Sequence, residues 1–425
     1  MSQAVETTLF GPAGWQPSGR AGRWQLAAMP NLHSHAFQRA MAGLAERLAN
    51  PEDSFWTWRE LMYRFAGRLD PDSQYAIACQ LYAEMLEAGY GTVCEFHYLH
   101  HAPDGRPYED PAAMSRALIA AADDTGIRLT LLPVLYMSGG FDGRPLSERQ
   151  RRFGHSLEAY LALLQSLRRL EHDRLKVGVA LHSLRAVPEA PMRELLAALA
   201  SEDLPIHIHV AEQIGEVQDC LAVRGARPVE WLLANAPVDA RWTLVHATHL
   251  SRDEVRGIAA SGATVAICPT TEANLGDGLF PLRDFLEADG WFGIGSDSHV
   301  SVSVVEELRW LEYGQRLAGR RRNVAALPGQ PSTGELLYGR ALAGGLRACG
   351  QPGGGDDRVT LLAEAPALAG ARRHDLLDRY LFCGNRSLVD EVEVAGRRRV
   401  AGGRHLQGEA IAARYADTLR RLLAD

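Results

Sequence analysis

The feature that most constrains the fold is a regular alternation, between about residues 26 and 300, of short apolar runs with longer amphipathic ones. The long runs place apolar residues at i, i+3 and i+4, which is typical of helices packed on a sheet. The short runs are rich in β-branched residues and have the character of strands: LAAMPNLHSH (26–35), GTVCEFHY (91–98), RLTLLPVLY (128–136), LKVGVALHS (175–183), LPIHIHV (204–210), WTLVHAT (242–248), ATVAICP (263–269) and GWFGIGSDS (290–298).

Strands that alternate with helices in this way predict a parallel α/β sheet, and eight of them predict a closed (β/α)8 barrel over residues 29–349. Several helical stretches stop at a glycine just before the next strand, which predicts helix ends at Gly89, Gly126 and Gly262. An open doubly wound sheet is the alternative. No G-x-G-x-x-G follows the first strand, so the barrel is favoured.

The two ends of the chain have a different pattern. Residues 350–360 (GQPGGGDDRVT) form a glycine-rich break, and residues 388–406 alternate apolar and polar side chains around a turn, which predicts a hairpin. Residues 409–424 predict a helix. We therefore expect 1–28 and 350–425 to form a small β subdomain with a C-terminal helix, in which the N-terminal segment pairs with the hairpin.

Composition excludes several classes of protein. The net charge of −7, from 45 basic and 52 acidic residues, argues against a nucleic-acid partner. No apolar run approaches the roughly 18–20 residues that cross a bilayer, and MSQAVETTLFGPAGW lacks the regions of a secretory signal. The six cysteines are far apart and form no C-x-x-C motif, as expected in a reducing compartment. We expect a soluble, cytoplasmic protein.

The sequence His33-Ser34-His35 at the end of the first predicted strand is the sharpest chemical feature. Alternation along a strand places the two imidazoles on one face, where both can reach one metal ion. Alone, the motif could equally be a pair of polar loop histidines. Its place changes that interpretation, because the functional groups of a barrel gather at the C-terminal ends of its strands.

Other ionisable residues fall at equivalent strand ends. His207 and His209 end the fifth strand, His246 lies on the sixth and Asp297 follows the eighth. Histidines and an aspartate give an N3O donor set for a divalent cation with one position open for water. Glu212, in the loop after the fifth strand, is the candidate general acid and base, and His246 the candidate for orienting the water.

Periodicity cannot choose between His207 and His209, which share a strand face. We favour His209 as the ligand because it is nearer the rim and forms an H-x-x-E motif with Glu212. Two-metal barrels of this kind commonly bridge their ions with a carboxylated lysine at the end of the fourth strand. Lys176, the single lysine of the chain, enters that strand at its N-terminal end, which favours one metal ion.

Long motifs resemble the amidohydrolase superfamily, in its mononuclear deaminase branch, and within it the formimidoylglutamate deiminases: MPNLHSHAFQRAMAGLAE, DSFWTWRELMYR, CEFHYLHH, HSLRAV, HIHVAEQ, LVHATH, TEANLGDGLFP and GIGSDSHVSVSVVEELRWLEYGQRL. The resemblance covers about residues 29–320. It implies a metal-dependent hydrolytic deamination, one divalent metal ion (zinc), a homodimer, and a β-sandwich that would be reduced here at its N-terminal side. It also implies site residues: metal ligands His33, His35, His209 and Asp297; the proton shuttle Glu212; His246; and substrate contacts Gln38, Arg59, Tyr98, His182 and Arg185.

The contacts implied by the resemblance suit a dicarboxylate such as N-formimino-L-glutamate. The guanidinium of Arg185 can bind a carboxylate through two hydrogen bonds, and Arg59 can serve a second one. The alternative for Arg59 is a surface helix residue, and TEANLGDGLFP either shapes the pocket mouth or only satisfies loop backbone. Rival functions are deamination of a nucleobase or a guanidino acid, and a non-catalytic binding scaffold.

Overall fold

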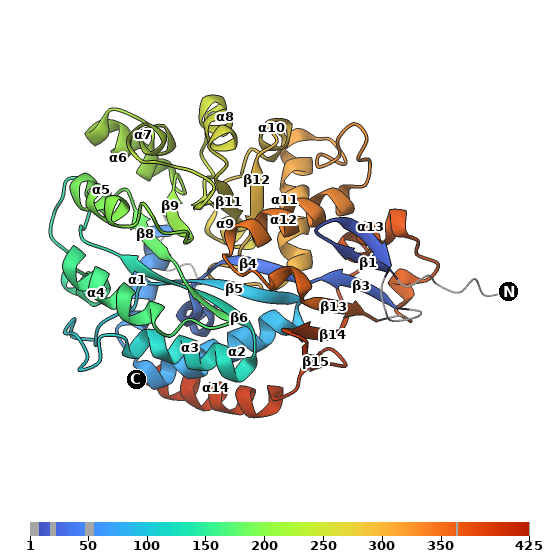
Figure 1. Ribbon diagram of the computed structural model, residues 1–425, viewed down its shortest axis with the longest axis horizontal. Helices are drawn as coiled ribbons and strands as arrows, with labels where there is room; N and C mark the ends of the chain where they lie inside the picture. Colours follow the sequence, from blue (N-terminus) through green and yellow to red (C-terminus); the bar gives the residue numbers. More distant parts are fainter. Residues whose placement is uncertain (1–7, 18–22, 47–54, 363, 425) are drawn as a thin grey trace.

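A closed parallel barrel forms the centre of the computed structural model, which describes residues 8–17, 23–46, 55–362 and 364–424. Its strands follow one another around the barrel in chain order, and pairing of β5 with β6 and of β4 with β12 closes it. The helices form an outer layer around it (Figure 1). The barrel strands are β4 (Met29–Ser34), β5 (Tyr90–His97), β6 (Arg128–Leu135), β7 (Leu175–Val177), β8 (Val179–Ser183), β9 (Ile206–Val210), β10 (Trp242–His246), β11 (Thr264–Ile267) and β12 (Trp291–Ile294).

The predicted barrel is confirmed, but two of its predicted strands differ in detail. The fourth strand is divided into β7 and β8 at Gly178, where an added Cβ would lie 2.7 Å from the Pro205 carbonyl oxygen. The run 26–35 is two strands in two sheets, with Ala28 between β3 (Trp24–Ala27) and β4. Both strands are fully buried, so their apolar pattern carries no signal for the change of sheet.

The predicted helices are present, and their ends follow local chemistry. Gly126 and Gly262 follow α3 and α8 with φ angles of 82° and 76°, as predicted for residues that end a helix. The Asp70 side chain accepts the Ser73 backbone N–H at the start of α2. The helices of the barrel region are α1 (Phe55–Ala66), α2 (Pro71–Glu87), α3 (Ala113–Thr125), α4 (Leu157–Arg168), α5 (Glu189–Ala198), α6 (Ile214–Arg224), α7 (Pro228–Asn235), α8 (Arg252–Ser261), α9 (Pro269–Leu275), α10 (Leu282–Glu287), α11 (Val304–Gly319) and α12 (Thr333–Ala348), with 3-10 turns η1 (Ala36–Met41) and η2 (Glu148–Phe153).

Strands from both ends of the chain form a second, mixed sheet beside the barrel, on the right in Figure 1. Its order is β16-β15-β14-β13-β3-β1-β2, so both ends of the chain contribute to one sheet, as predicted, but the N-terminal β3 pairs with β13 and not with the predicted hairpin of β14 and β15. The C-terminal strand that pairs with the N-terminal segment is β13, which begins within the predicted glycine-rich break. Helix α14 packs on α2. The elements are β1 (Thr8–Gly11), β2 (Gly14–Pro17), β13 (Arg358–Leu361), β14 (Val389–Val394), β15 (Arg397–Ala401), β16 (Arg404–His405), α13 (Arg373–Phe382) and α14 (Gly408–Leu423), with η3 (Gly354–Asp356) and η4 (Pro366–Leu368).

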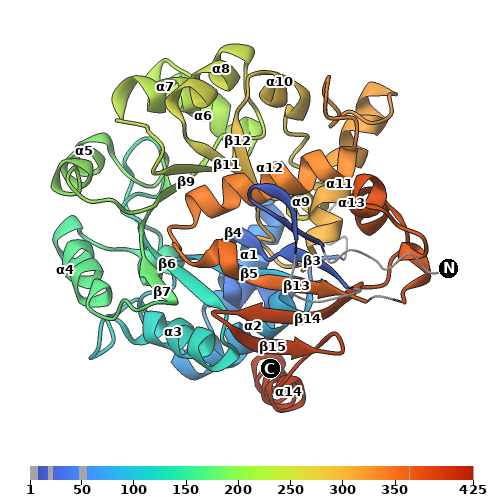
Figure 2. The same cartoon turned by 45° about the vertical axis from the view of Figure 1, so that its right-hand side comes forward.

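The two sheets are joined by buried polar contacts. The Arg128 guanidinium, at the start of β6, donates to both carboxylate oxygens of Asp357 at 2.8 and 3.1 Å. The Asp357 backbone carbonyl accepts the Ala28 N–H at 3.0 Å. Figure 2 shows β13 and β14 lying next to the β4–β5 side of the barrel. Because an unpaired buried charge is costly, the terminal sheet and the barrel stabilise each other.

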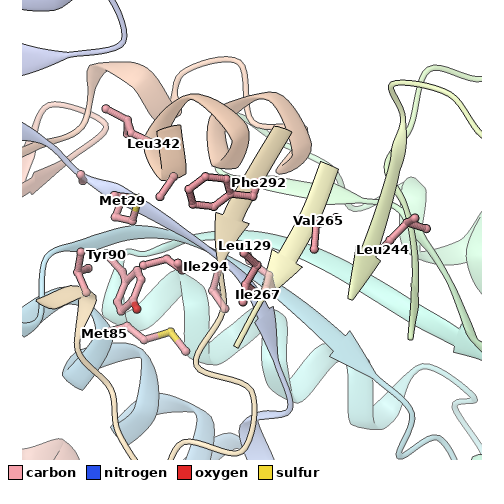
Figure 3. Packing of buried hydrophobic residues seen from close by; sticks show 14 of the residues in the cluster. Met29, Met85, Tyr90, Leu129, Leu244, Val265, Ile267, Phe292, Ile294 and Leu342 are labelled. Carbon is pink, nitrogen blue, oxygen red and sulfur yellow. The ribbon is translucent and has the colours of Figure 1, made fainter. Parts of the chain in front are cut away.

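Helix α12 packs closely against β12, which fixes one wall of the barrel. An added Cβ at Gly344 would lie 2.0 Å from the Phe292 backbone oxygen, so only glycine fits this contact. Figure 3 shows Leu342 of this helix beside Phe292, with Met29 and Ile294 in the same apolar cluster. None of the helices in the described ranges combines the length and apolar character that a bilayer crossing requires.

Candidate active site and metal centre

The H-x-H motif lies where β4 ends, at the C-terminal edge of the barrel. Both imidazoles are buried, and their rings meet edge to face with centroids 4.6 Å apart. The Nε2 atoms of His33 and His35 are 3.1 Å apart. The alternation along the strand therefore brings the two rings to one point, as the sequence predicts.

Two further side chains reach the same point from other strands. Nε2 of His209, near the end of β9, lies 3.0 Å from Nε2 of His33. Oδ1 of Asp297 lies 3.4 Å from Nε2 of both His33 and His35. The backbone N–H of Asp297 donates to the His33 carbonyl at 3.0 Å, which ties the loop after β12 to the end of β4.

These separations fit one divalent cation. Ligands about 2.0–2.2 Å from a tetrahedral zinc ion have donor atoms about 3.3–3.6 Å apart, close to the 3.0–3.4 Å between His33 and each of the other three groups and between His35 and Asp297. Nδ1 of His35 and of His209 lie 2.8 and 2.9 Å from backbone carbonyl oxygens. Since a carbonyl only accepts, Nδ1 carries the proton and the Nε2 lone pairs face one another. A cation would remove their mutual repulsion.

The structure separates the two histidines of β9. His209 joins the cluster, whereas His207 is buried deeper in the barrel, and neither of its ring nitrogens hydrogen-bonds to a described residue. Burial lowers the pKa of His207 to about 3, so this ring is neutral. The position of His209 is the one favoured from the sequence.

Glu212 and His246 lie on the open side of the cluster. His246 Nε2 is 3.8 Å from Glu212 Oε1 and 3.8 Å from Asp297 Oδ2. Burial raises the pKa of the Glu212 carboxyl above its ordinary value, and His246 opposes this shift. Glu212 opposes the effect of burial on His246 in turn, so the pKa of His246 is raised. A carboxyl that exchanges its proton near neutrality suits general acid and base chemistry.

Two glutamates that the sequence analysis did not single out hold these groups in place. Glu216, four residues beyond Glu212, accepts the backbone N–H groups of Ala211 at 3.1 Å and Glu212 at 3.0 Å. Glu272, in TEANLGDGLFP, lies 3.3 Å from Nδ1 of His246. Their buried carboxylates are thus part of the site, and an i, i+4 carboxylate after the H-x-x-E motif was the signal for the first.

A third missed glutamate lies under the H-x-H motif. Glu95 of β5 accepts the Ala36 N–H at 2.6 Å and the Ser34 hydroxyl at 2.6 Å. The His299 ring lies 3.2 Å from the Ser34 hydroxyl. Burial raises the pKa of Glu95 to about 7. These contacts fix the turn between β4 and η1, and with it the direction of both histidine rings.

The pocket above the cluster contains every substrate contact implied by the resemblance. Gln38 Nε2 donates to the Tyr98 hydroxyl at 2.9 Å, while Gln38 Oε1 is buried with no hydrogen-bond partner among the described residues. Burial lowers the pKa of His182, with Arg185 as the next cause. The pocket is lined by His35, Gln38, Trp58, Arg59, Met62, Tyr63, Tyr98, Tyr136, Phe153, His182, Ser183, Arg185, His209, Glu212, Glu216, His246, Leu275 and Asp297.

The two arginines and the TEANLGDGLFP segment all contribute side chains to the lining of this pocket. Arg59 lines it from α1, so it is not only a surface helix residue. Arg185 lines it from the turn after β8 and opposes the rise that burial causes in the pKa of the Glu212 carboxyl. Leu275 of the segment lines the pocket from α9, while the Thr271 hydroxyl of the same segment donates to the Ser296 carbonyl at 3.3 Å. The segment therefore both shapes the pocket and satisfies buried polar groups. Lys176 lies on β7, outside the pocket.

Comparisons with known proteins agree with this arrangement. The chain is 56% identical over 411 residues, 95% of this chain and 90% of the relative, to the formimidoylglutamate deiminase of Pseudomonas aeruginosa. An 8-oxoguanine deaminase of the same species is 25% identical over 94% of this chain and 87% of its own.

Solved structures agree as well. An amidohydrolase from Brucella melitensis superposes with a TM-score of 0.92 at 42% identity, covering 100% of both chains. A zinc-bound adenosine deaminase from Xanthomonas campestris shares the fold, with a TM-score of 0.78 at 20% identity over 94% of this chain and 86% of that one. The model of the amidohydrolase family matches residues 26–327, from within β3 to beyond α11. Barrel, strand-end cluster and sequence match agree: the chain belongs to the amidohydrolase family.

Proposed function

We propose that the chain hydrolyses N-formimino-L-glutamate to N-formyl-L-glutamate and ammonia. The observation that carries this function is one pocket that is lined both by Glu212 with His35, His209 and Asp297 and by the guanidinium groups of Arg59 and Arg185. The first part suits hydrolysis of a C–N bond, and the second suits two carboxylates. The relative that is 56% identical bears the name of this activity.

We assign the ligands of one zinc ion to His33, His35, His209 and Asp297. The three Nε2 atoms and Oδ1 lie 3.0–3.4 Å apart along the contacts given above, and this N3O set suits zinc. Lys176 is too far toward the other end of the barrel to bridge a second ion, which supports a single one. When bound, the ion supplies Lewis-acid chemistry that brings the pKa of a water near neutrality.

Glu212 is assigned as the proton shuttle. Its carboxylate takes one proton from the attacking water while the oxygen bonds to the formimino carbon. The protonated carboxyl then donates this proton to the terminal nitrogen. The second proton of the water passes from the added hydroxyl, by way of the Asp297 carboxylate, to the same nitrogen as the C–N bond breaks, so ammonia leaves and the carbon keeps the oxygen as a formyl group. The raised pKa of Glu212 lets one group act as base and then as acid.

His246 and Asp297 assist this transfer. His246 Nε2 lies 3.8 Å from both the Glu212 and Asp297 carboxylates, so it can stabilise negative charge on the attacking oxygen. Asp297 Oδ2 faces His246 while Oδ1 faces the histidine cluster, so its second oxygen is free to accept a proton. Glu272 keeps the His246 ring in this orientation.

The remaining contacts orient the substrate. Gln38 Oε1, the buried acceptor without a partner among the described residues, can accept a formimino N–H. Tyr98, whose hydroxyl accepts the Gln38 amide, can donate its own proton to a carboxylate. His182 lies under the pocket with its ring 5.2 Å from that of His209, and Arg185 and Arg59 supply the positive charge.

An ammonia-release assay tests this function. The panel contains N-formimino-L-glutamate, a guanidino acid of the same length, and 8-oxoguanine, the substrate named for one of the relatives. We expect the largest kcat/KM for N-formimino-L-glutamate. A larger value for 8-oxoguanine would contradict the proposal, because a purine uses neither guanidinium as a carboxylate partner.

The homodimer implied by the resemblance and the cytoplasmic location expected from the sequence belong to the same proposal. A chain of 46.5 kDa predicts a native mass of about 93 kDa, twice the chain mass. Light scattering after gel filtration measures this mass, and 46.5 kDa would exclude the dimer. Fractionation of the source cells tests the location.

A further inference from the structure

We propose that Tyr136 binds the substrate carboxylate farther from the reacting carbon and is a specificity-determining residue. This inference rests on the function proposed above and extends it to a residue outside the motif-derived contacts. Tyr136 directly follows β6, is buried, and lines the same pocket as Arg59 and Arg185.

The position of Tyr136 separates its role from that of Tyr98. The Tyr98 ring lies 4.9 Å from the ring of His35, a proposed metal ligand. The Tyr136 ring contacts His182 at 4.5 Å and Phe153 at 6.0 Å. Tyr136 thus lies one side chain farther from the cluster than Tyr98. A substrate whose formimino carbon is at the cluster would bring its distal carboxylate to this part of the pocket.

The hydrogen bonds of Gln150 determine where the Tyr136 proton points. Gln150 Oε1 accepts the Ser147 backbone N–H at 2.9 Å, which fixes the orientation of the amide. Gln150 Nε2 must therefore be the group that donates to the Tyr136 hydroxyl at 2.9 Å. Because that oxygen is already an acceptor, its own O–H is left to donate to another group. The pocket is where a substrate oxygen can accept it.

The charges around Tyr136 favour an anion. Burial raises the pKa of the neighbouring Tyr63 to about 12, Tyr136 adds to this shift, and Arg59 and Arg185 oppose it. All four side chains therefore act on one region of the pocket. Two guanidinium groups and a hydroxyl aimed at one region form a carboxylate site rather than a neutral one, and a charge-assisted O–H···O⁻ bond is the stronger kind.

The test compares two substrates of equal shape on wild type and Tyr136→Phe. N-formimino-L-glutamate carries the distal carboxylate, and N-formimino-L-glutamine replaces it with an amide. We expect Tyr136→Phe to lower kcat/KM about 10- to 100-fold for the first, mainly through KM, and less than about threefold for the second. Tyr160→Phe is the matched control: its buried hydroxyl donates to the Pro133 carbonyl, away from the pocket. It should change neither value beyond about twofold.

Each result decides the inference. An equal loss on both substrates would assign Tyr136 a packing role, and less than a twofold loss on N-formimino-L-glutamate would remove the contact altogether. Calorimetry with the proposed product keeps the test independent of turnover. If wild type binds N-formyl-L-glutamate but hydrolyses neither substrate, the proposed function fails. In that case, tighter binding of N-formyl-L-glutamate to wild type than to Tyr136→Phe still supports the carboxylate contact. If wild type does not bind N-formyl-L-glutamate, both proposals fail.

Discussion

Two groups of buried histidines lie in the barrel region, and they differ in what their ring nitrogens face. In the first, the Nε2 atoms of His35 and His209 both face Nε2 of His33, and the Asp297 carboxylate faces His33 and His35. The second, which we call the second histidine cluster, comes from CEFHYLHH and the end of η2. Its members are His97, His100, His101 and His155.

In the second histidine cluster the rings meet but their nitrogens do not converge. Ring centroids are 4.4 Å apart for His100 and His155, and 5.0 Å for His97 and His100. Each of the four rings has one buried nitrogen without a hydrogen-bond partner among the described residues. Arg152, rather than a carboxylate, is the charged residue that acts on the pKa values of His97 and His101.

The difference teaches that spacing and number of histidines do not make a metal site. The sequence H-Y-L-H-H offers three imidazoles within five residues, against two within three residues for H-S-H. A cation needs lone pairs that face one point and a negative charge that offsets its own. Asp297 supplies that charge only to the first group. We therefore expect the first group to bind metal and the second to stay neutral.

Replacing one histidine by glutamine should remove the metal ion when the histidine belongs to the first group, and should leave the metal content unchanged when it belongs to the second histidine cluster. His209→Gln should remove the metal and, with it, essentially all activity, because the ligand set loses one of its nitrogens. His100→Gln should keep one equivalent per chain. Elemental analysis of protein purified without added metal measures both, together with the wild-type value. Two equivalents in the wild type, one of them lost in His100→Gln, would show that the second histidine cluster also binds metal.

Glu212→Gln should lower the rate of hydrolysis without removing the metal ion that we expect the first group of histidines to bind. The amide keeps the size of the side chain but cannot move a proton, so kcat should fall about 10²- to 10⁴-fold. Metal content should stay at the wild-type value, unlike that of His209→Gln. Steady-state kinetics and elemental analysis on one preparation test both points. Activity above about a tenth of wild type would mean that another base performs this step.

Arg185→Met tests whether charge in the pocket serves the substrate. The methionine keeps most of the apolar stem and removes the guanidinium, which should cost about 2–5 kcal/mol in kcat/KM, mainly through KM. Melting temperature and metal content should barely change, because Arg185 is assigned as a substrate contact. A near-normal kcat/KM for N-formimino-L-glutamate would require the carboxylates to be bound elsewhere.

The second histidine cluster should make the free energy of unfolding fall as the solution becomes acidic. Burial lowers the pKa of His97 to about 3, whereas an unfolded histidine titrates at about 6.5. Below pH 6.5 the unfolded chain therefore binds a proton that the native chain does not, and the free energy of unfolding falls. The stabilising contribution is complete above pH 6.5 and is lost as the pH falls toward 3.

At pH 5 this loss amounts to about 2 kcal/mol for His97. Urea unfolding at pH 7 and pH 5 should show a decrease that is smaller by this amount in His97→Gln than in wild type. The comparison within each protein cancels the constant cost of the substitution. An equal decrease in both proteins would mean that His97 takes up no proton on unfolding in this range.

The barrel and the strand-end cluster were predictable because they leave periodic signals. Alternating apolar runs indicate strands and helices, and His33, His209 and Asp297 fall at strand ends whose position in a barrel is general. The break at Gly178 and the division at Ala28 leave no such signal, since they depend on neighbouring backbones that only the folded chain brings close.

The supporting carboxylates were less predictable for a physical reason. Glu95 and Glu272 act through backbone N–H groups or another side chain, and no spacing in the sequence marks them, whereas Glu216 is marked by its position four residues after Glu212. Tyr136 was missed in the same way, because the role that we propose for it depends on a hydrogen bond from Gln150 of η2. The second histidine cluster shows the converse case, a metal-like spacing without convergence.

The pairing of β3 with β13 has a consequence for the order of events during synthesis. Strand β3 is continuous with the strand that carries the H-x-H motif, yet its antiparallel partner is Arg358–Leu361. At about 5–20 residues per second, a ribosome needs roughly 20–60 s to make the chain between them. During that time β3 lacks its partner on one edge and Arg128 lacks Asp357. The first barrel strand, β4, pairs with β5 and β12, which are made earlier, so the terminal sheet rather than the barrel waits for this late part of the chain.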